Sequence, residues 1–380
     1  MAILAGISGL LLIAVIMWDA FEVVVLPRRV TRRLRLARLF YRAAWKAWLA
    51  IGRRFASSKR RETYLSFFGP LSLILLLTMW AAGMVLGFAL VQAALGSALN
   101  VSDGPVNFST DLYMSGTTFF TLGLGDVTPR TTPARIITVI EAGTGFGFLA
   151  LVIGYLPVTY SAFSRREVGT VLLDARAGSP PSAAELLRRS SEGRHEDLDE
   201  LLRDWERWAA ELLESHISYP VLCYYRSQHS NQSWLAALTT ILDTSALVMT
   251  GIDGISPRQA QLTFAMGRHA VADLAQIFYT PPHALRKDRL PPADLARLRE
   301  LLEAAGVMLH DGPVAEGRLA ELRRIYEPYA SALAEYLLMP LPLWLPPGGG
   351  FDSWQTSAWE RIATGKAANV AVAARTDEHF

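Results

Sequence analysis

The sequence has a single cysteine, Cys223, among its 380 residues. One thiol excludes an intrachain disulfide framework and a zinc site built from several cysteines. The net charge is also small, +2 with histidine neutral, so the overall charge indicates no class of partner. No Lys or Arg precedes the apolar run at residues 1–26. A cleaved secretory signal peptide needs a basic segment there, so we expect this run to be retained as a membrane helix.

Apolar residues are abundant and gather in three long runs. Hydrophobic residues make up 51% of the chain, and the mean hydropathy is +0.23. The runs at 1–26, 64–95 and 136–163 can each cross a hydrocarbon core of about 30 Å as a helix. The fold class predicted from this pattern is an all-α membrane protein with three spans.

Basic residues gather between the first two runs. Residues 28–61 contain thirteen Lys or Arg and no acidic residue. By the positive-inside rule this segment is cytoplasmic, which places the N-terminus and the loop 96–109, itself without Lys or Arg, outside. The third run then leads inward, so we expect a cytoplasmic C-terminal region. The high Arg and Ala content favours a bacterial inner (plasma) membrane.

The basic segment has the periodicity of an amphipathic helix over residues 30–55. Arg35, Arg38, Arg42 and Lys46 recur at spacings of three and four, which places them on one face. Such a helix lies at the membrane interface, so anionic lipid is the expected partner of residues 28–61. The segment is too densely charged to span the membrane as a voltage sensor, and its place argues against nucleic acid.

Two acidic residues, Asp19 and Glu22, lie in the inner half of the first run. Ionisable groups at membrane depth are costly and are functional candidates. One interpretation is a charge pair with Arg28, Arg29 or a basic residue of the following helix that couples the first span to gating. The other is an interfacial pair that only fixes the depth of the helix.

Between the second and third runs lies the sequence Thr121-Leu122-Gly123-Leu124-Gly125-Asp126. Two alternating glycines permit the left-handed backbone that turns successive carbonyls the same way. Together with the Thr121 hydroxyl, those carbonyls form a ladder of oxygens that can replace the hydration shell of a monovalent cation.

This stretch resembles the pore of the potassium channel superfamily, whose pattern is Thr-(Val/Ile)-Gly-(Tyr/Phe/Leu)-Gly-Asp after a short pore helix. Thr121, Gly123, Gly125 and Asp126 match, whereas Leu122 and Leu124 replace the commoner residues. The resemblance covers residues 64–166. It implies a pore helix at 111–120, K⁺ sites at Thr121, Leu122, Gly123 and Leu124, and four copies around one axis. Many family members carry a carboxylate at the position of Thr117, so this chain braces its filter differently.

The resemblance also implies roles for the inner helix, expected at 134–163. Gly145 follows Gly125 by twenty residues, the usual spacing of the family's gating hinge, although small-residue packing is the alternative. Pro157 would bend the helix near the intracellular gate. Glu141 either faces the cavity as a charge or forms a hydrogen bond behind the pore helix. Asp103 and Asp111 would join Asp126 in an acidic outer mouth.

Residues 167–380 lack the signatures of the usual channel regulators. There is no strand–GxGxxG–helix unit, no cyclic-nucleotide β-roll pattern and no EF-hand loop. Apolar periodicity and proline pairs instead predict helices at about 182–217, 232–250, 256–279, 292–308, 313–338 and 352–372. We expect no catalytic group and no metal-ligand cluster. One segment rich in ring and polar side chains is either a ligand site or a helical core: His216, Tyr219, Arg226, His229 and Trp234.

The sequence therefore predicts a homotetrameric K⁺-selective channel without a cofactor. Its parts are a membrane helix at 1–27, a basic interfacial helix at 28–62, a pore domain at 63–166 with its filter at 121–126, and a cytosolic α-helical regulatory domain at 167–380. The ligand of that domain is open. Alternatives are a weakly selective cation channel, a membrane sensor or enzyme that uses the pore only for assembly, and a K⁺ uptake subunit of the Trk/Ktr kind. The last usually has four pore loops in one chain with one glycine each, which this sequence does not have.

Overall fold

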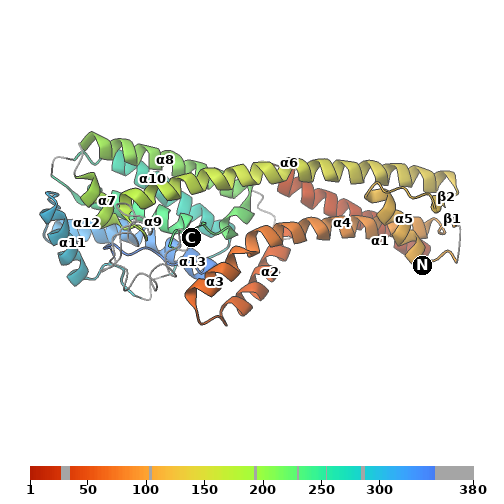
Figure 1. The fold of residues 1–380 in the computed structure, drawn as a ribbon, viewed down its shortest axis with the longest axis horizontal. Coiled ribbons are helices and arrows are strands. Elements are labelled where there is room, and N and C mark those ends of the chain that lie inside the picture. Colours follow the sequence, from red (N-terminus) through yellow and green to blue (C-terminus); the bar gives the residue numbers. More distant parts are fainter. Residues whose placement is uncertain are drawn as a thin grey trace, which may run out of the picture. The chain divides into compact units, whose positions relative to one another are not determined.

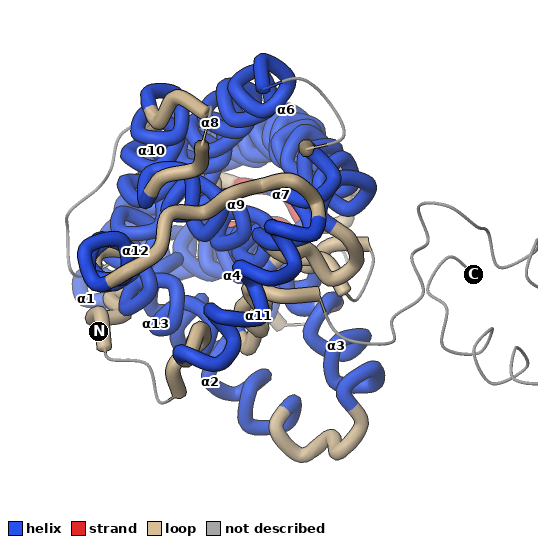
Figure 2. Tube along the Cα trace, turned by 90° about the vertical axis from the view of Figure 1, so that its left-hand side faces the viewer, coloured by secondary structure: helices blue, strands red, loops and turns tan. Residues whose placement is uncertain are grey.

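The computed structural model describes residues 1–26, 35–101, 105–191, 195–228, 231–253, 255–283 and 287–346. These residues are almost entirely helical, with two short strands (Figures 1 and 2). Three helical stretches are long and apolar enough to cross a membrane: Ala2–Val25, Lys59–Ala94 and Thr132–Ala177. The expected all-α membrane fold is confirmed. The chain divides into two compact units, Met1–Ser161 and Ala162–Phe380, and the division falls inside the helix α6 (Thr132–Ala177).

In the first unit, α1 (Ala2–Ala20), which ends in the π-turn η1 (Phe21–Val25), packs along α4 (Phe68–Ala94). Glycines allow this close contact. A Cβ on Gly9 would lie 2.6 Å from the Gly87 carbonyl oxygen, and one on Gly87 would lie 2.7 Å from Ile13. Small residues at a helix crossing let backbones approach each other in a membrane. A Cβ on Gly83 would likewise overlap the Ile16 side chain, so this glycine also lets α1 approach α4.

The two acidic residues of α1 hold the start of α2 (Leu36–Gly52). The Asp19 carboxylate, only 3% exposed, accepts hydrogen bonds from the Ala37 amide at 3.0 Å and from the Trp80 indole at 3.0 Å. Glu22 accepts from the Trp18 indole and pairs with Arg35 at 3.2 Å. Asp19 thus neutralises the positive end of the α2 dipole, and both carboxylates tie α2 to α1.

The basic segment is two helices where one was predicted. α2 begins at Leu36, later than the predicted start, and α3 (Ser58–Ser66) follows it. Trp45, 1% exposed, packs on Phe68, and Trp48 stacks on Tyr64 with ring centroids 4.5 Å apart. These rings fasten both helices to the start of α4. Arg28 and Arg29, named above as partners for the carboxylates, lie outside the described residues.

The second unit is a helical domain around one buried helix, α9 (Trp234–Thr250), in which all but one residue is buried. A helix that is buried on every side forms the core of a domain. The helices α7, α8, α10, α12 and α13 contact it. The bounds of the remaining elements of this unit are α7 (Ala183–Ser190), α8 (His195–Ser218), η2 (Pro220–Tyr224), α10 (Arg258–Ile277), α11 (Pro292–Ala304), α12 (Pro313–Arg324) and α13 (Glu327–Leu337).

A network of buried ionic and hydrogen-bonding groups connects α9 to the segments before α11 and α13. Asp243 of α9 binds Arg289 through both oxygens, at 2.6 and 3.1 Å, and accepts a hydrogen bond from the Tyr326 hydroxyl. Arg289 also pairs with Glu327 at 3.0 Å. Bidentate, charge-assisted bonds of this kind fix geometry as well as adding energy. They hold the connection before α11 and the start of α13 against α9.

Candidate functional site

The short helix before the TLGLGD stretch is α5 (Phe108–Phe119). Its N-cap is Asn107, whose side-chain oxygen accepts from the amides of Ser109 at 3.0 Å and Thr110 at 3.2 Å. The Thr110 hydroxyl accepts in return from the Asn107 amide, which completes a capping box. The helix therefore starts three residues before the predicted 111.

Asp111 is not part of an acidic mouth. It is fully buried, and its carboxylate accepts a hydrogen bond from the Ser97 hydroxyl at 2.6 Å. Because Ser97 follows α4, this bond joins the end of α4 to the first turn of α5. Asp103, the other residue expected at the mouth, lies outside the described residues.

Residues 121–126 leave the C-terminal end of α5 with an alternating backbone. The φ angles of Thr121, Gly123 and Gly125 are +58°, +54° and +83°. Leu122 and Leu124, between them, are not in that region. Alternation of left- and right-handed residues turns consecutive carbonyl groups toward one side. The start of the stretch is fixed because the Thr117 carbonyl accepts from the Leu122 amide at 2.8 Å.

The outer end of the stretch is fixed by a side chain and by a small sheet. The Tyr113 hydroxyl of α5 donates to Asp126 at 2.8 Å. Directly afterwards, β2 (Val127–Pro129) pairs antiparallel with β1 (Leu99–Val101), and Val101 lies opposite Val127. The segment is thus held at both ends, which is the arrangement that a rigid ring of oxygens needs.

The Leu122 and Leu124 side chains are 63% and 64% exposed in the single chain. Large apolar side chains next to a rigid backbone loop are normally covered. The exposed face of α6 beside them is also apolar, with Phe146 at 68% and Ile153 at 63%. These surfaces are of the kind that contacts lipid or further copies of the chain.

The opposite face of α6 packs behind α5. Gln92 of α4 donates to the Ala134 carbonyl and to the Thr138 hydroxyl. One turn further along α6, Glu141 is fully buried and forms a hydrogen bond with the Ser115 hydroxyl of α5. Glu141 therefore does not line a cavity as a charge, and the other alternative from the sequence, a hydrogen bond behind the pore helix, describes its place.

Gly145 lies where α6 touches the C-terminal end of α5. A Cβ on Gly145 would overlap the Phe119 carbonyl oxygen, whereas Gly143 and Gly147 have no neighbouring atom within 4 Å of such a Cβ. Phe148 adds a ring contact to Phe119, with centroids 5.7 Å apart. The packing alternative for Gly145 thus explains why this position has no side chain.

The inner helix is longer than predicted. It was expected to end at 163, but α6 runs to Ala177 with Pro157 inside it. Proline lacks the amide that would bond four residues back, so the helix is weakest there. Beyond Pro157 the helix enters the second unit, where Arg166 is buried.

Arg166 is the centre of a contact that the sequence did not indicate. Its guanidinium donates to the carbonyls of Leu222 at 2.8 Å and Tyr225 at 3.0 Å, and pairs with Glu167 at 2.8 Å. In the structure it fastens α6 to the turn around η2, and only the carbonyl positions in the fold reveal this.

The four described residues of the proposed ligand site make separate packing and hydrogen-bond contacts. His216 and Trp234 are fully buried and lie ring against ring, with centroids 5.4 Å apart. Arg226 donates to the carbonyls of Leu337 and Leu338 at the end of α13. Tyr219 is half-buried in an apolar cluster with Leu222, and His229 lies outside the described residues. The helical-core alternative therefore holds for the described members.

His216 is neutral for two reasons. Its Nδ1 lies 2.8 Å from the Leu212 carbonyl and so carries the proton, while its Nε2 lies 3.3 Å from the Arg166 guanidinium and accepts. Burial, and then the charge of Arg166, hold the pKa of His216 well below its ordinary value. Burial likewise raises the pKa of the Cys223 thiol, which is fully buried close by.

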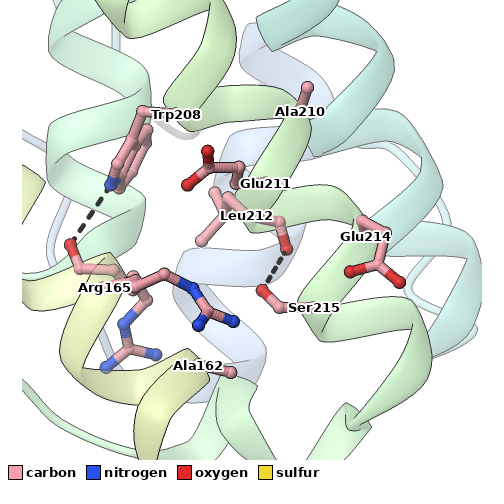
Figure 3. A pocket seen from close by; sticks show the side chains of 9 residues that line it. Ala162, Arg165, Trp208, Ala210, Glu211, Leu212, Glu214 and Ser215 are labelled. Carbon is pink, nitrogen blue, oxygen red and sulfur yellow. Dashed lines mark hydrogen bonds between the residues drawn. The ribbon is translucent and has the colours of Figure 1, made fainter.

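A cavity of about 260 Å³ lies beside this contact, between α6 and α8 (Figure 3). Arg165, Glu211 and Glu214 line it, together with Trp208, whose indole donates to the Arg166 carbonyl. The lining charges are mixed in sign, so the cavity does not indicate a ligand class. Among the described residues there is no cluster of His, Cys, Asp or Glu that could hold a metal ion.

Comparison with known proteins gives two matches. Residues 74–160 match a family model described as "Ion channel", and these are the residues from α4 through the TLGLGD stretch into α6. The chain is 25% identical over 260 residues to the "Uncharacterized membrane protein YdjJ" of Bacillus subtilis (strain 168), an alignment that covers 67% of this chain and 74% of that protein. No solved structure matches the chain.

Proposed function

We propose that the protein is a K⁺-selective channel, because residues 74–160 match a family model described as "Ion channel". The observation that supports this most is the backbone of Thr121 to Gly125, with positive φ at every second residue. Stacked carbonyls from such a backbone bind a dehydrated K⁺ ion. The ion sites are the oxygens of Thr121, Leu122, Gly123 and Leu124 up to Gly125, and Asp126 stands at their outer end.

The pore is a homotetramer in this proposal. Each chain has one TLGLGD stretch, and a ring of oxygens around an ion needs four. The exposed Leu122 and Leu124 side chains, and the exposed apolar face of α6 with Phe146 and Ile153, supply surfaces for neighbouring copies. An oligomer of this kind is built from identical copies around one axis.

The second unit sets the gate through α6 in this proposal. The support is that α6 belongs to both units of the chain. Pro157 is the weak point at which the helix bends, and Arg166 is the anchor by which the second unit holds it. The protein lies in a bacterial inner membrane in this proposal, with the second unit in the cytoplasm. The basic residues 28–61 face anionic lipid.

The test is K⁺ flux into proteoliposomes under a K⁺ gradient, with Ba²⁺ as blocker and Na⁺ in parallel. We expect Ba²⁺-sensitive K⁺ flux without Na⁺ flux, and none from the Gly123→Ala or Gly125→Ala proteins. A Cβ in a left-handed residue costs about 1–2 kcal/mol, and four copies of the strain fall on one ring of oxygens. Assembly of both variants should remain normal in size-exclusion chromatography.

Gly96 is the matched control. Its φ is +84°, against +83° for Gly125, and it too has open space around the Cβ position. The Gly96→Ala protein suffers the same local strain outside the filter, so it should conduct. Normal flux from Gly123→Ala would refute the filter, and equal Ba²⁺-sensitive flux of Na⁺ and K⁺ would replace K⁺ selectivity with a weakly selective cation channel.

A further inference from the structure

Three helices meet at one serine behind the filter. The Ser115 hydroxyl of α5 lies 2.7 Å from the Val85 carbonyl of α4. The same hydroxyl is in hydrogen-bond contact with the Glu141 carboxyl of α6. Ser115 and Glu141 are both fully buried, so no water competes for these contacts.

The number of hydrogen atoms that Ser115 and Glu141 can donate decides the protonation state of Glu141. A serine hydroxyl has one hydrogen to donate. The Val85 carbonyl can only accept, and an ionised carboxylate can only accept as well. Each contact has a hydrogen atom of its own only if Glu141 carries a proton and donates it to the Ser115 oxygen, which leaves the serine hydrogen for Val85.

The second carboxyl oxygen supports the same state. Within the described residues, Glu141 Oε2 is buried and has no hydrogen-bond partner. An ionised carboxylate with a bare buried oxygen and no cation beside it would carry a large desolvation cost. Burial of a neutral carboxylic acid costs far less free energy, since its second oxygen is only an unsatisfied acceptor.

We propose that Glu141 is a neutral carboxylic acid that positions the pore helix α5 by a directed chain of hydrogen bonds from α6 through Ser115 to Val85. The effect on conduction rests on the proposed channel function, whereas the protonation state does not. Glu141 is a positioning residue, since it touches no filter residue.

The position of these hydrogen bonds explains how Glu141 affects the filter. Ser115 stands two residues before Thr117, whose carbonyl holds the Leu122 amide. Four residues along α6 from Glu141, Gly145 meets the end of α5 at Phe119. The pore helix is thus held by α6 at its middle and at its end. A buried carboxyl supplied by the inner helix takes the place of one at Thr117.

The protonation state is measured by infrared spectroscopy of the full-length protein in lipid at neutral pH. We expect the carbonyl-stretch band of a protonated carboxylic acid in the wild type and its absence in Glu141→Gln. If the difference spectrum shows only carboxylate bands, the proposal is wrong, whatever the flux assay gives.

The positioning role is measured by K⁺ flux and by the ratio of K⁺ to Na⁺ flux. Glu141→Gln keeps a donor toward Ser115 and should retain the wild-type ratio. Glu141→Ala and Ser115→Ala each remove the hydrogen bond between α6 and α5. Each should lower K⁺ flux about tenfold, the equivalent of one lost hydrogen bond of about 1.4 kcal/mol. The ratio of K⁺ to Na⁺ flux should fall as well.

Thr144 supplies the control, because its hydroxyl donates to the Ile140 carbonyl of its own helix. Thr144→Ala should leave flux and ratio unchanged. If Glu141→Ala lowers only the yield of folded protein and leaves the ratio unchanged, the residue is structural and the positioning role is refuted. Failure of the filter itself would appear separately, as normal flux from Gly123→Ala.

Discussion

Residues of one chemical type have different roles in this pore, and their surroundings decide which. Asp111 is buried and accepts from Ser97, so it joins two helices. Asp126 is exposed, accepts from Tyr113 and ends the TLGLGD stretch. The sequence showed only that Asp126 is the last residue of this stretch and that Asp111 comes shortly before it. The exposure of each aspartate and its hydrogen-bond partner distinguish the two roles, and both depend on the fold.

Substitutions at Gly145 and its neighbouring glycines distinguish a packing role of Gly145 from a role as a gating hinge. Because a Cβ at this position would overlap the Phe119 carbonyl, Gly145→Ala should displace the end of α5 and lower K⁺ flux strongly. Gly143→Ala and Gly147→Ala meet nothing within 4 Å and should conduct normally. Proteoliposome flux measures all three. Equal losses in the three variants would indicate that backbone freedom of the whole glycine cluster, and not contact, matters.

At the scale of elements, the motif and the apolar periodicity predicted the main helices. The short helix before the TLGLGD stretch, the two long apolar helices around it and the helix over 232–250 appear in the structure close to the expected residues. Proline pairs and runs located the breaks in the second unit because proline cannot continue a helix. These features depend on local sequence, which is why they could be read from it.

Other boundaries depended on contacts that no local pattern contains. The predicted end of the inner helix, 163, is the end of the third apolar run, whereas α6 continues to Ala177. The guanidinium of Arg166 is satisfied by carbonyls more than fifty residues away. His216 and Trp234 resembled ligand-site residues by type, and only their full burial shows that they form core.

The short helix α7 should give the second unit an acid-sensitive stability. Hydrogen bonds from Arg188, and then from Arg189, lower the pKa of Glu185 from 4.5 to about 2. A carboxylate with a depressed pKa stabilises the folded state above its unfolded value, and this contribution is lost as the pH falls through the folded value. The thermal midpoint of the full-length protein in detergent should therefore fall between about pH 5 and about pH 3.

The Glu185→Gln protein should show a smaller fall over that range, because it has no charge to lose. Glu300→Gln, a change at an exposed residue of α11, should follow the wild type. An identical pH profile for Glu185→Gln and the wild type would contradict the role of this ion pair.

At the scale of the whole molecule, the proposed tetramer of four copies around one pore would make defects dominant. Coexpression of equal amounts of wild-type and Gly123→Ala chains should give mixed assemblies. If one altered chain stops conduction, only about one-sixteenth of random tetramers conduct. K⁺ flux per reconstituted protein measures this fraction. Flux near one half would mean that each chain conducts by itself, and the homotetramer would be wrong.

Cys223 also makes the protein convenient for spectroscopy. The only thiol of the chain is completely buried in the second unit, and its raised pKa keeps it from forming the reactive thiolate. Maleimide dyes and spin labels should therefore not react with the native protein. A cysteine introduced at an exposed residue of α6 would then be labelled alone, so probe distances could report inner-helix movement without first removing a natural cysteine.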